Sequence, residues 1–262
     1  AYGWSVRKSH GFNWDILEGE EFKQYEPVFS PELGCAVRLK DHGILSDPGR
    51  YVKDLAAHVE ATGGKVLKGE VTDIAVESGN VTGVRVGGEK IDCDSAIIAA
   101  GIWSTDLARQ LGLKVPMESE RGYHLELWEP NFMPKMPAMV ASGKFVITPM
   151  DGRLRLAGVV EFGGVDAPPS KAPIELLKKN AEAALPGISW KKTSEWMGHR
   201  PSIVDSIPVI GEVPSVSGAF VGFGHDHIGL TGGPKTGRIL SQLVSGKRPN
   251  LDLAFYSPSR FQ

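Results

Sequence analysis

The residues best suited to chemistry lie near the C-terminal end, in a glycine-rich loop between a predicted strand and a predicted helix. Residues 219–223 are apolar and indicate a strand, Gly224–Gly233 hold four glycines and two histidines, and a helix is predicted to begin at Pro234. Glycines let a backbone approach a ligand closely. A helix start offers free N–H groups and a positive dipole end. The pattern suits an anionic group such as a phosphate, although a turn whose glycines serve only packing explains it equally well.

Three other segments carry candidate binding residues. Arg200 precedes a proline, which favours extended backbone, and its planar guanidinium can bind a carboxylate through two hydrogen bonds. Residues 99–101 end a predicted buried strand, at the sheet edge where ligands of α/β sheets bind. Residues 121–124 (Arg-Gly-Tyr-His) begin another strand. Each segment also has a purely structural interpretation. Arg200 can be a solvated surface arginine, residues 99–101 can serve ordinary strand–helix packing, and the aromatic residues of 121–124 can be structural.

Other chemistries find little support in the sequence. His225, Asp226 and His227 are adjacent, but neighbours on a loop rarely converge on one centre and no matching ligand cluster is visible, so no metal is expected. A Gly-x-Ser-x-Gly elbow and a Cys/His nucleophile pattern are both absent from the sequence. Cys35 and Cys93 fit neither a zinc motif nor a disulfide framework, which favours a reducing compartment.

Composition limits the function classes further. The 262 residues carry a net charge of −2, so nucleic-acid binding has no electrostatic support. The longest apolar runs are too short to span a bilayer, and the first residues contain no signal peptide. The length fits one large domain or two small ones. Because the chain opens without Met on a polar, aromatic stretch, we expect a fragment of a longer protein.

Hydrophobic periodicity predicts a mixed α/β or α+β fold. The run at 96–100 is wholly apolar and predicts a strand buried on both faces, while residues 51–59 predict a helix with one apolar face. Helices are expected at 48–62, 104–111, 173–185 and 234–245, and strands at 65–67, 71–77, 81–86, 89–92, 96–100, 121–128, 144–148, 153–160, 194–197 and 219–223.

Three segments in order carry a family resemblance. They are residues 99–108 (AAGIWSTDLA) with 121–125 (RGYHL), residues 198–211 (GHRPSIVDSIPVIG) and residues 222–237 (GFGHDHIGLTGGPKTG). With them the chain resembles the FAD-dependent D-amino-acid oxidase superfamily, nearest to bacterial D-amino-acid dehydrogenases and glycine/sarcosine oxidases. The resemblance covers nearly the whole chain from about Pro48.

The resemblance implies an incomplete FAD-binding Rossmann-like domain, residues 42–118 and 203–262, interleaved with an antiparallel-sheet substrate domain, residues 1–41 and 119–202. The Gly-x-Gly-x-x-Gly motif with which the family opens is absent here, so roughly the first third of such a protein is missing. The implied cofactor-binding residues are Val71, Gly101, Trp103, Gly224, His225, Ile228, Gly229, Leu230 and Thr231. The implied substrate-binding residues are Arg200, Tyr123, His227 and Phe145, of which Phe145 replaces a lid tyrosine of glycine oxidase.

The implied activity is oxidation of the CH–NH bond of a small D-amino acid, with hydride transfer to N5 of FAD and Arg200 holding the substrate carboxylate. One alternative is a flavin oxidase of N-methyl amino acids or 2-hydroxy acids. Another is a catalytically inert fragment that does not hold FAD and whose open sheet edge is covered by the absent N-terminal segment or by a homo-oligomer mate. A cytoplasmic location is expected, with or without a peripheral contact to the inner membrane.

Overall fold

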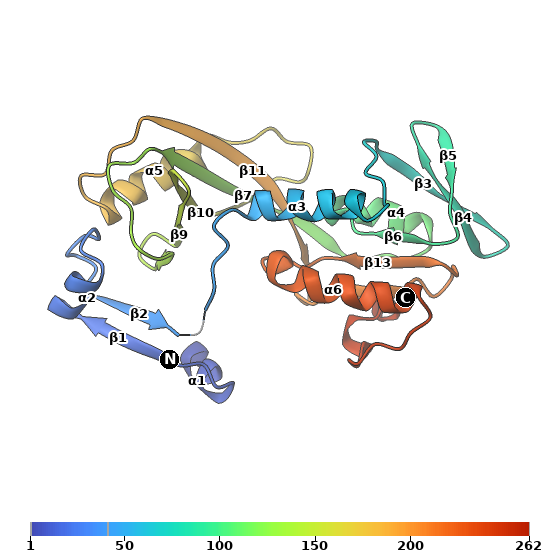
Figure 1. Cartoon of the computed structure of the whole chain (residues 1–262), viewed down its shortest axis with the longest axis horizontal. Coiled ribbons are helices and arrows are strands. Elements are labelled where there is room, and N and C mark those ends of the chain that lie inside the picture. The colour runs from blue at the N-terminus through green and yellow to red at the C-terminus, as the bar shows by residue number, and fades with distance from the viewer. Residues whose placement is uncertain (1, 41, 262) are drawn as a thin grey trace. The chain divides into compact units, whose positions relative to one another are not determined.

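The computed structural model describes residues 2–40 and 42–261, which fall into two compact units. Unit 1 comprises residues 1–53, 122–160 and 168–197, and unit 2 comprises residues 54–121, 161–167 and 198–262. Each unit is discontinuous in sequence, and four of the boundaries between the units fall within helices or strands. Figure 1 shows the elements of the whole chain in order of sequence. None of the helices in the described residues is both long and apolar enough to cross a membrane.

Unit 1 is built on an antiparallel sheet with strand order β11-β7-β10-β9-β8. Its strands are β7 (Met117–Trp128), β8 (Ala138–Val140), β9 (Phe145–Met150), β10 (Arg153–Phe162) and β11 (Lys192–Ile203). Helix α5 (Ala172–Ala184) buries Ile174, Leu177, Ala181 and Ala184, as its i, i+3, i+7 spacing predicts. The preceding elements are α1 (Tyr2–Ser9), β1 (Trp14–Glu18), α2 (Gly19–Tyr25) and β2 (Cys35–Leu39), of which β1 and β2 pair antiparallel.

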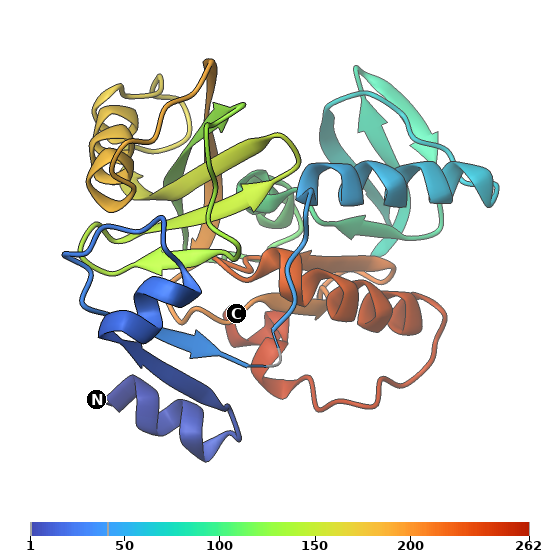
Figure 2. The ribbon, with the colours of Figure 1, turned by 60° about the vertical axis from the view of Figure 1, so that its left-hand side comes forward.

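Unit 2 contains two three-stranded sheets. One is the predicted meander of β3 (Val71–Glu77), β4 (Asn80–Val86) and β5 (Glu89–Asp92). The other has the order β12-β13-β6, in which β6 (Ala96–Ile98) runs parallel to β13 (Ala219–Phe223) and β12 (Val209–Glu212) runs antiparallel to it. Helix α6 (Gly229–Val244) contacts β12 and β13, and both views show it running along that sheet (Figure 2). The remaining helices are η1 (Gly101–Trp103), α4 (Ser104–Gln110), η2 (Ala254–Tyr256) and η3 (Pro258–Phe261).

Two predicted strands are corrected. Residues 65–67 form no strand, and Val66 and Leu67 are 54% and 66% exposed, because no described strand pairs with them. Two apolar side chains do not make a β-strand, because its backbone N–H and C=O groups also need partners on a neighbouring strand. The strand at 96–100 ends at Ile98 and is an edge strand, with Ile97 47% exposed rather than buried on both faces.

Two helices also differ from expectation. Helix α6 begins at Gly229 rather than at Pro234, so that Thr231 lies in its first turn. Pro234 is accommodated inside the helix, where it removes a single N–H donor. Helix α3 (Pro48–Ala61) begins as predicted, with the Asp47 carboxylate accepting a 2.9 Å hydrogen bond from the Arg50 N–H. Its apolar residues are nevertheless all at least partly exposed.

Candidate functional site

Parallel pairing of β6 and β13 brings two of the predicted cofactor-binding segments to one sheet edge. Ala219, Phe220 and Val221 pair in register with residues 96–98, so the carboxyl ends of both strands point the same way. The chain leaves β6 into residues 99–103 and leaves β13 into residues 224–231. This is the edge at which ligands of α/β sheets bind.

The start of α6 at this edge is open. Ile228 precedes the helix and gives no side-chain cap, and Ile228, Leu230 and Thr231 are all exposed. The first backbone hydrogen bond of the helix runs from the Gly232 N–H to the Ile228 carbonyl at 2.8 Å. The N–H groups of Gly229, Leu230 and Thr231 therefore have no acceptor within the helix. They form a donor cluster at the positive end of the helix dipole.

His225 lies behind this helix start and positions it. Its Nε2 lies 2.8 Å from Thr236 Oγ1, and the Thr236 hydroxyl donates to the Gly232 carbonyl at 3.1 Å. Since that hydroxyl has only one hydrogen to give, His225 Nε2 must be the donor to it. Burial lowers the pKa of His225, which favours the neutral ring. A Cβ atom at Gly232 would lie at an ordinary contact distance of 3.4 Å from the His225 ring, so the imidazole packs directly against the helix start.

The loop after β6 is shaped for close approach of a ligand. Gly101 has φ +60°, and a Cβ added there would meet no atom within 4 Å. Trp103 is 59% exposed, whereas Ser104 is fully buried and its Oγ has no hydrogen-bond partner among the described residues. A backbone conformation that favours glycine, open space beside it and an orphaned hydroxyl together fit a polar cofactor at this edge.

The end of β11 contacts the same loop. The His199 ring lies edge-on to Trp103, with ring centroids 5.6 Å apart, and its Nδ1 is 2.7 Å from Ser119 Oγ. Arg200 follows His199, as a half-buried residue whose Nη1 is buried without a hydrogen-bond partner among residues 2–40 and 42–261. Burial lowers the pKa of Arg200, while the charges of Glu120 and Asp226 act in the opposite direction.

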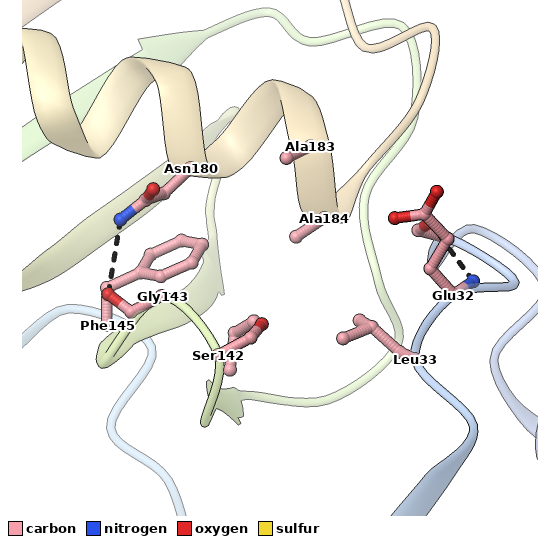
Figure 3. A pocket seen from close by; sticks show the side chains of 10 residues that line it. Glu32, Leu33, Ser142, Gly143, Phe145, Asn180, Ala183 and Ala184 are labelled. Carbon is pink, nitrogen blue, oxygen red and sulfur yellow. Dashed lines mark hydrogen bonds between the residues drawn. The ribbon is translucent and has the colours of Figure 1, made fainter.

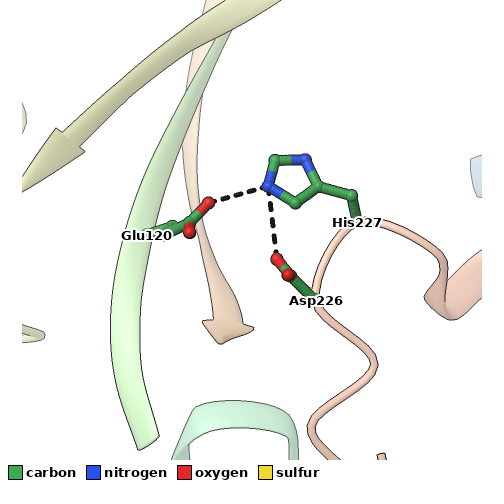
Figure 4. Close-up of side chains that lie close together, drawn as sticks. All are labelled: Glu120, Asp226 and His227. Atoms are coloured by element: carbon green, nitrogen blue, oxygen red, sulfur yellow. Dashed lines mark hydrogen bonds and ion pairs between the residues drawn. The ribbon is translucent and has the colours of Figure 1, made fainter. Parts of the chain in front are cut away.

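The two carboxylates near Arg200 form a cluster with His227 (Figure 4). His227 Nε2 lies 2.7 Å from Glu120 Oε2 and 3.2 Å from Asp226 Oδ1. Ser202 donates a 2.8 Å hydrogen bond to Asp226 Oδ1. The three possible metal-ligand atoms lie within 4.8 Å of one another, so the fold supplies Glu120 as a partner that the sequence did not reveal. The absence of a metal stays a prediction.

Two of the predicted substrate residues lie in the core of unit 1. Tyr123 is 2% exposed, and its hydroxyl accepts a 2.9 Å hydrogen bond from the Ser170 N–H. Phe145 has no exposed surface and lines a cavity of about 300 Å³, next to Gly143 and Asn180 (Figure 3). Neither lies in unit 2 with Arg200 and His227. Their contact with substrate stays a prediction.

Val71 differs from the other predicted cofactor residues. It begins β3 in the meander, which is a different sheet from the one that contains β6 and β13. Its residue surface is 37% exposed. The nearby hydrogen bond from Gln110 Nε2 to the Thr72 carbonyl ties α4 to the start of that strand. The role of Val71 at a cofactor therefore stays a prediction, on a neighbouring element of the same unit.

A sheet edge with a glycine-rich loop and an open helix start, in a mixed α/β fold with antiparallel sheets, is the arrangement found where α/β proteins bind ligands. The family model for FAD dependent oxidoreductases matches residues 2–243, and the chain belongs to this family. The predicted family is thereby confirmed, and FAD is the cofactor of that family. The fold is confirmed by a glycine oxidase from Geobacillus kaustophilus, which matches 99% of this chain and 70% of its own length at 25% identity and a TM-score of 0.86.

Two curated relatives show the same kinship. The D-amino-acid oxidase of Bradyrhizobium diazoefficiens is 36% identical over 99% of this chain and 62% of its own length. The glycine oxidase of Pseudomonas putida is 31% identical over 88% of this chain and 64% of its own length. The chain thus spans less than two thirds of the length of either relative.

Glu120, Ser104 and His199 are the residues that sequence reasoning missed. Glu120 lies 107 residues before His227 in the chain, and no local pattern connects the two. Ser104 was read only as part of a helix start. His199 stands beside Arg200 in the conspicuous Gly-His-Arg-Pro segment, which is the one signal that pointed to it.

Proposed function

We propose that this chain carries the substrate carboxylate site and part of the flavin site of an oxidoreductase that oxidises the CH–NH bond of a small amino acid, with D-amino acids as the first candidates. Membership of the FAD-dependent family supports the reaction class, and the names of the two curated relatives support amino acids as substrates. The single observation that carries the proposal is Arg200, a half-buried cation with a buried, unpartnered Nη1 in the described part of the chain.

A buried donor without a partner is costly, by about 1–3 kcal/mol or more for a charged group, so its presence points to an absent ligand. A carboxylate supplies two acceptor oxygens in the plane that a guanidinium matches. Binding the carboxylate there would fix the α-carbon beside the β6–β13 edge, since His199 links the Arg200 segment to Trp103. Orientation of this kind is the main contribution that a protein makes to flavin chemistry.

When bound, FAD supplies the acceptor for the hydrogen and two electrons of the substrate C–H bond. The residues that would hold it are Gly101 and Trp103 on one loop, and Gly224, with the residues at the start of α6, on the other. The N–H groups of Gly229, Leu230 and Thr231, which have no acceptor within the helix, would stabilise negative charge there. His225 would act through the helix start that it positions.

The test is kinetic and uses flavin-loaded enzyme that contains this chain. Arg200→Ala should raise KM for D-amino acids by about ten-fold or more, because the carboxylate loses a charged double hydrogen bond. Arg200→Lys should recover only part of the effect, since it keeps the charge and loses the planar fork. Arg238→Ala is the matched control, because Arg238 is exposed on α6 in the same unit. An unchanged KM in Arg200→Ala contradicts the proposal.

Two alternatives remain beside this proposal. An oxidase of N-methyl amino acids or 2-hydroxy acids would use the same arginine–carboxylate contact, and a substrate panel separates it. A chain that does not retain FAD by itself is favoured by the edge position of β6, where Ile97 is 47% exposed. A cytoplasmic location, a peripheral membrane contact and a homo-oligomer all stay predictions.

A further inference from the structure

Glu120 stands out among the charged residues of unit 2, because it lies beside the proposed carboxylate site and the proposed function has not used it. It extends from the start of β7, while Asp226 and His227 come from the loop after β13 (Figure 4). The Glu120 side chain is only 20% exposed and that of Asp226 is 19% exposed. The charges of both carboxylates act on the guanidinium of Arg200, and the Asp226 N–H donates a 3.3 Å hydrogen bond to the carbonyl of Pro201, the residue after Arg200.

The hydrogen bonds of the cluster engage one oxygen of each carboxylate. Asp226 uses Oδ1 twice, accepting from Ser202 and lying 3.2 Å from His227. Glu120 meets His227 through Oε2 alone, and its Oε1 accepts no hydrogen bond from any of the described residues. The His227 ring fixes the position of the Glu120 carboxylate while leaving that oxygen free to accept.

An amino acid carries both an anionic carboxylate and a nitrogen that can be cationic, so its binding site is favoured by a cation and an anion close together. Its α-carboxylate and α-nitrogen are attached to the same carbon, so a site that binds the first through Arg200 must meet the second a few ångströms away. As the C–N bond of an amine becomes C=N, the nitrogen lone pair forms the second bond and positive charge grows on nitrogen. A carboxylate beside that nitrogen stabilises both the bound ammonium ion and this developing charge. The neutral hydroxyl of a 2-hydroxy acid gains much less from it.

We infer that Glu120, held in place by His227, binds the α-nitrogen of the substrate and makes the site select amino acids over 2-hydroxy acids. The inference rests on the proposed function, since it requires the carboxylate to bind Arg200. It assigns Glu120 the role of a specificity-determining residue and His227 that of a positioning residue.

The test is equilibrium binding to the 262-residue chain, followed by NMR, with D-alanine, propionate and D-lactate as probes. All residues involved lie in unit 2. Because the assay measures equilibrium binding, it does not depend on turnover. Glu120→Gln should weaken D-alanine binding about ten-fold and leave propionate and D-lactate equally or more tightly bound, because removal of a negative charge near Arg200 favours an anion. Glu120→Asp should retain part of the preference for D-alanine. Glu118→Gln, an exposed neighbour on the same strand, is the charge-matched control.

The outcomes separate the two claims. Weaker binding of D-alanine with propionate bound equally or more tightly supports the inference, because a merely structural defect would weaken all three ligands together. Parallel losses, or no change in any of them, overturn it and leave Arg200 as the carboxylate site. If the unaltered chain binds none of the three ligands, or if Arg200→Ala leaves propionate binding unchanged, the proposed carboxylate site is contradicted. The inference about Glu120, which depends on that site, is then contradicted as well.

Discussion

Gly224, at the exit of β13, is predicted to be the most demanding of the glycines at the candidate cofactor edge. It combines a left-handed backbone conformation with a crowded Cβ position, whereas Gly101 and Gly222 each have only one of these two constraints. Its φ is +77°, and a Cβ atom added there would lie 2.1 Å from Ile203 Cδ1 and 2.7 Å from Ile203 Cγ1. Gly101 has a positive φ of +60° but open space, and Gly222 has crowding, 2.6 Å from Leu240 Cδ1, without a positive φ. The three glycines therefore allow the two effects to be measured apart.

The expected losses of stability follow from these geometries. A left-handed conformation costs an alanine about 1–2 kcal/mol, overpacking of a core costs about 1–3 kcal/mol, and loss of glycine's freedom in the unfolded chain returns about 0.4–1 kcal/mol. Gly101→Ala should therefore destabilise by roughly 1 kcal/mol, Gly222→Ala by roughly 1–2 and Gly224→Ala by roughly 2–4. Ile203 is 3% exposed, which limits its freedom to move aside.

The assay is urea denaturation of the three variants beside the unaltered chain. Gly229→Ala is a fourth, matched variant, since its added Cβ would lie at an ordinary 3.5 Å from His225 Cβ, and its stability should change by less than about 1 kcal/mol. A Gly224→Ala loss no larger than that of Gly101→Ala would refute the reasoning, because the close contact with Ile203 would then contribute nothing.

Two further predictions concern histidines. Burial lowers the pKa of His124 to about 4, while its ring stacks on Trp196 with centroids 5.0 Å apart. The unfolded chain therefore binds a proton at His124 more readily than the folded chain, and the free energy of unfolding should fall as the pH drops from about 6.5 to 4. After allowance for solvent screening, the loss is about 1–2 kcal/mol. In a pH series of denaturation curves, His124→Phe should flatten the dependence of stability on pH over this range. Thr236→Val should destabilise α6 by about 1 kcal/mol, seen as a lower thermal midpoint, because it removes the acceptor for His225 and the donor to the Gly232 carbonyl; an unchanged midpoint would show that this pair does not hold the helix start.

Local periodicity was sufficient for some elements and insufficient for others. The buried face of α5, with Ile174, Leu177 and Ala181, was predictable because the pattern, the helix and the burial all arise within one segment. Residues 65–67 include the apolar pair Val66 and Leu67 but form no strand, because a strand also needs a hydrogen-bonding partner that sequence composition does not show. Ile97 was predicted to be buried for the same reason, although β6 lies at a sheet edge.

The candidate site shows the same division. The loop from Gly224 to Thr231 and the Arg200 segment were found because their residues are contiguous and distinctive in the sequence. The contribution of Glu120 was invisible, since only the fold brings the start of β7 to the loop that carries His227. The early start of α6 was missed because Pro234 was taken as a helix start, whereas the helix accommodates it one and a half turns in.

The central claim, that the β6–β13 edge and the start of α6 form part of an FAD site, is tested most directly by the visible absorption spectrum of FAD titrated with the purified chain. We predict a saturable shift of the flavin bands. Gly101→Asn should diminish the shift, because asparagine tolerates the left-handed backbone and fills the open space with a side chain. A flavin spectrum that stays identical to that of free FAD at excess chain would contradict the claim and favour the alternative of a chain that does not hold the cofactor.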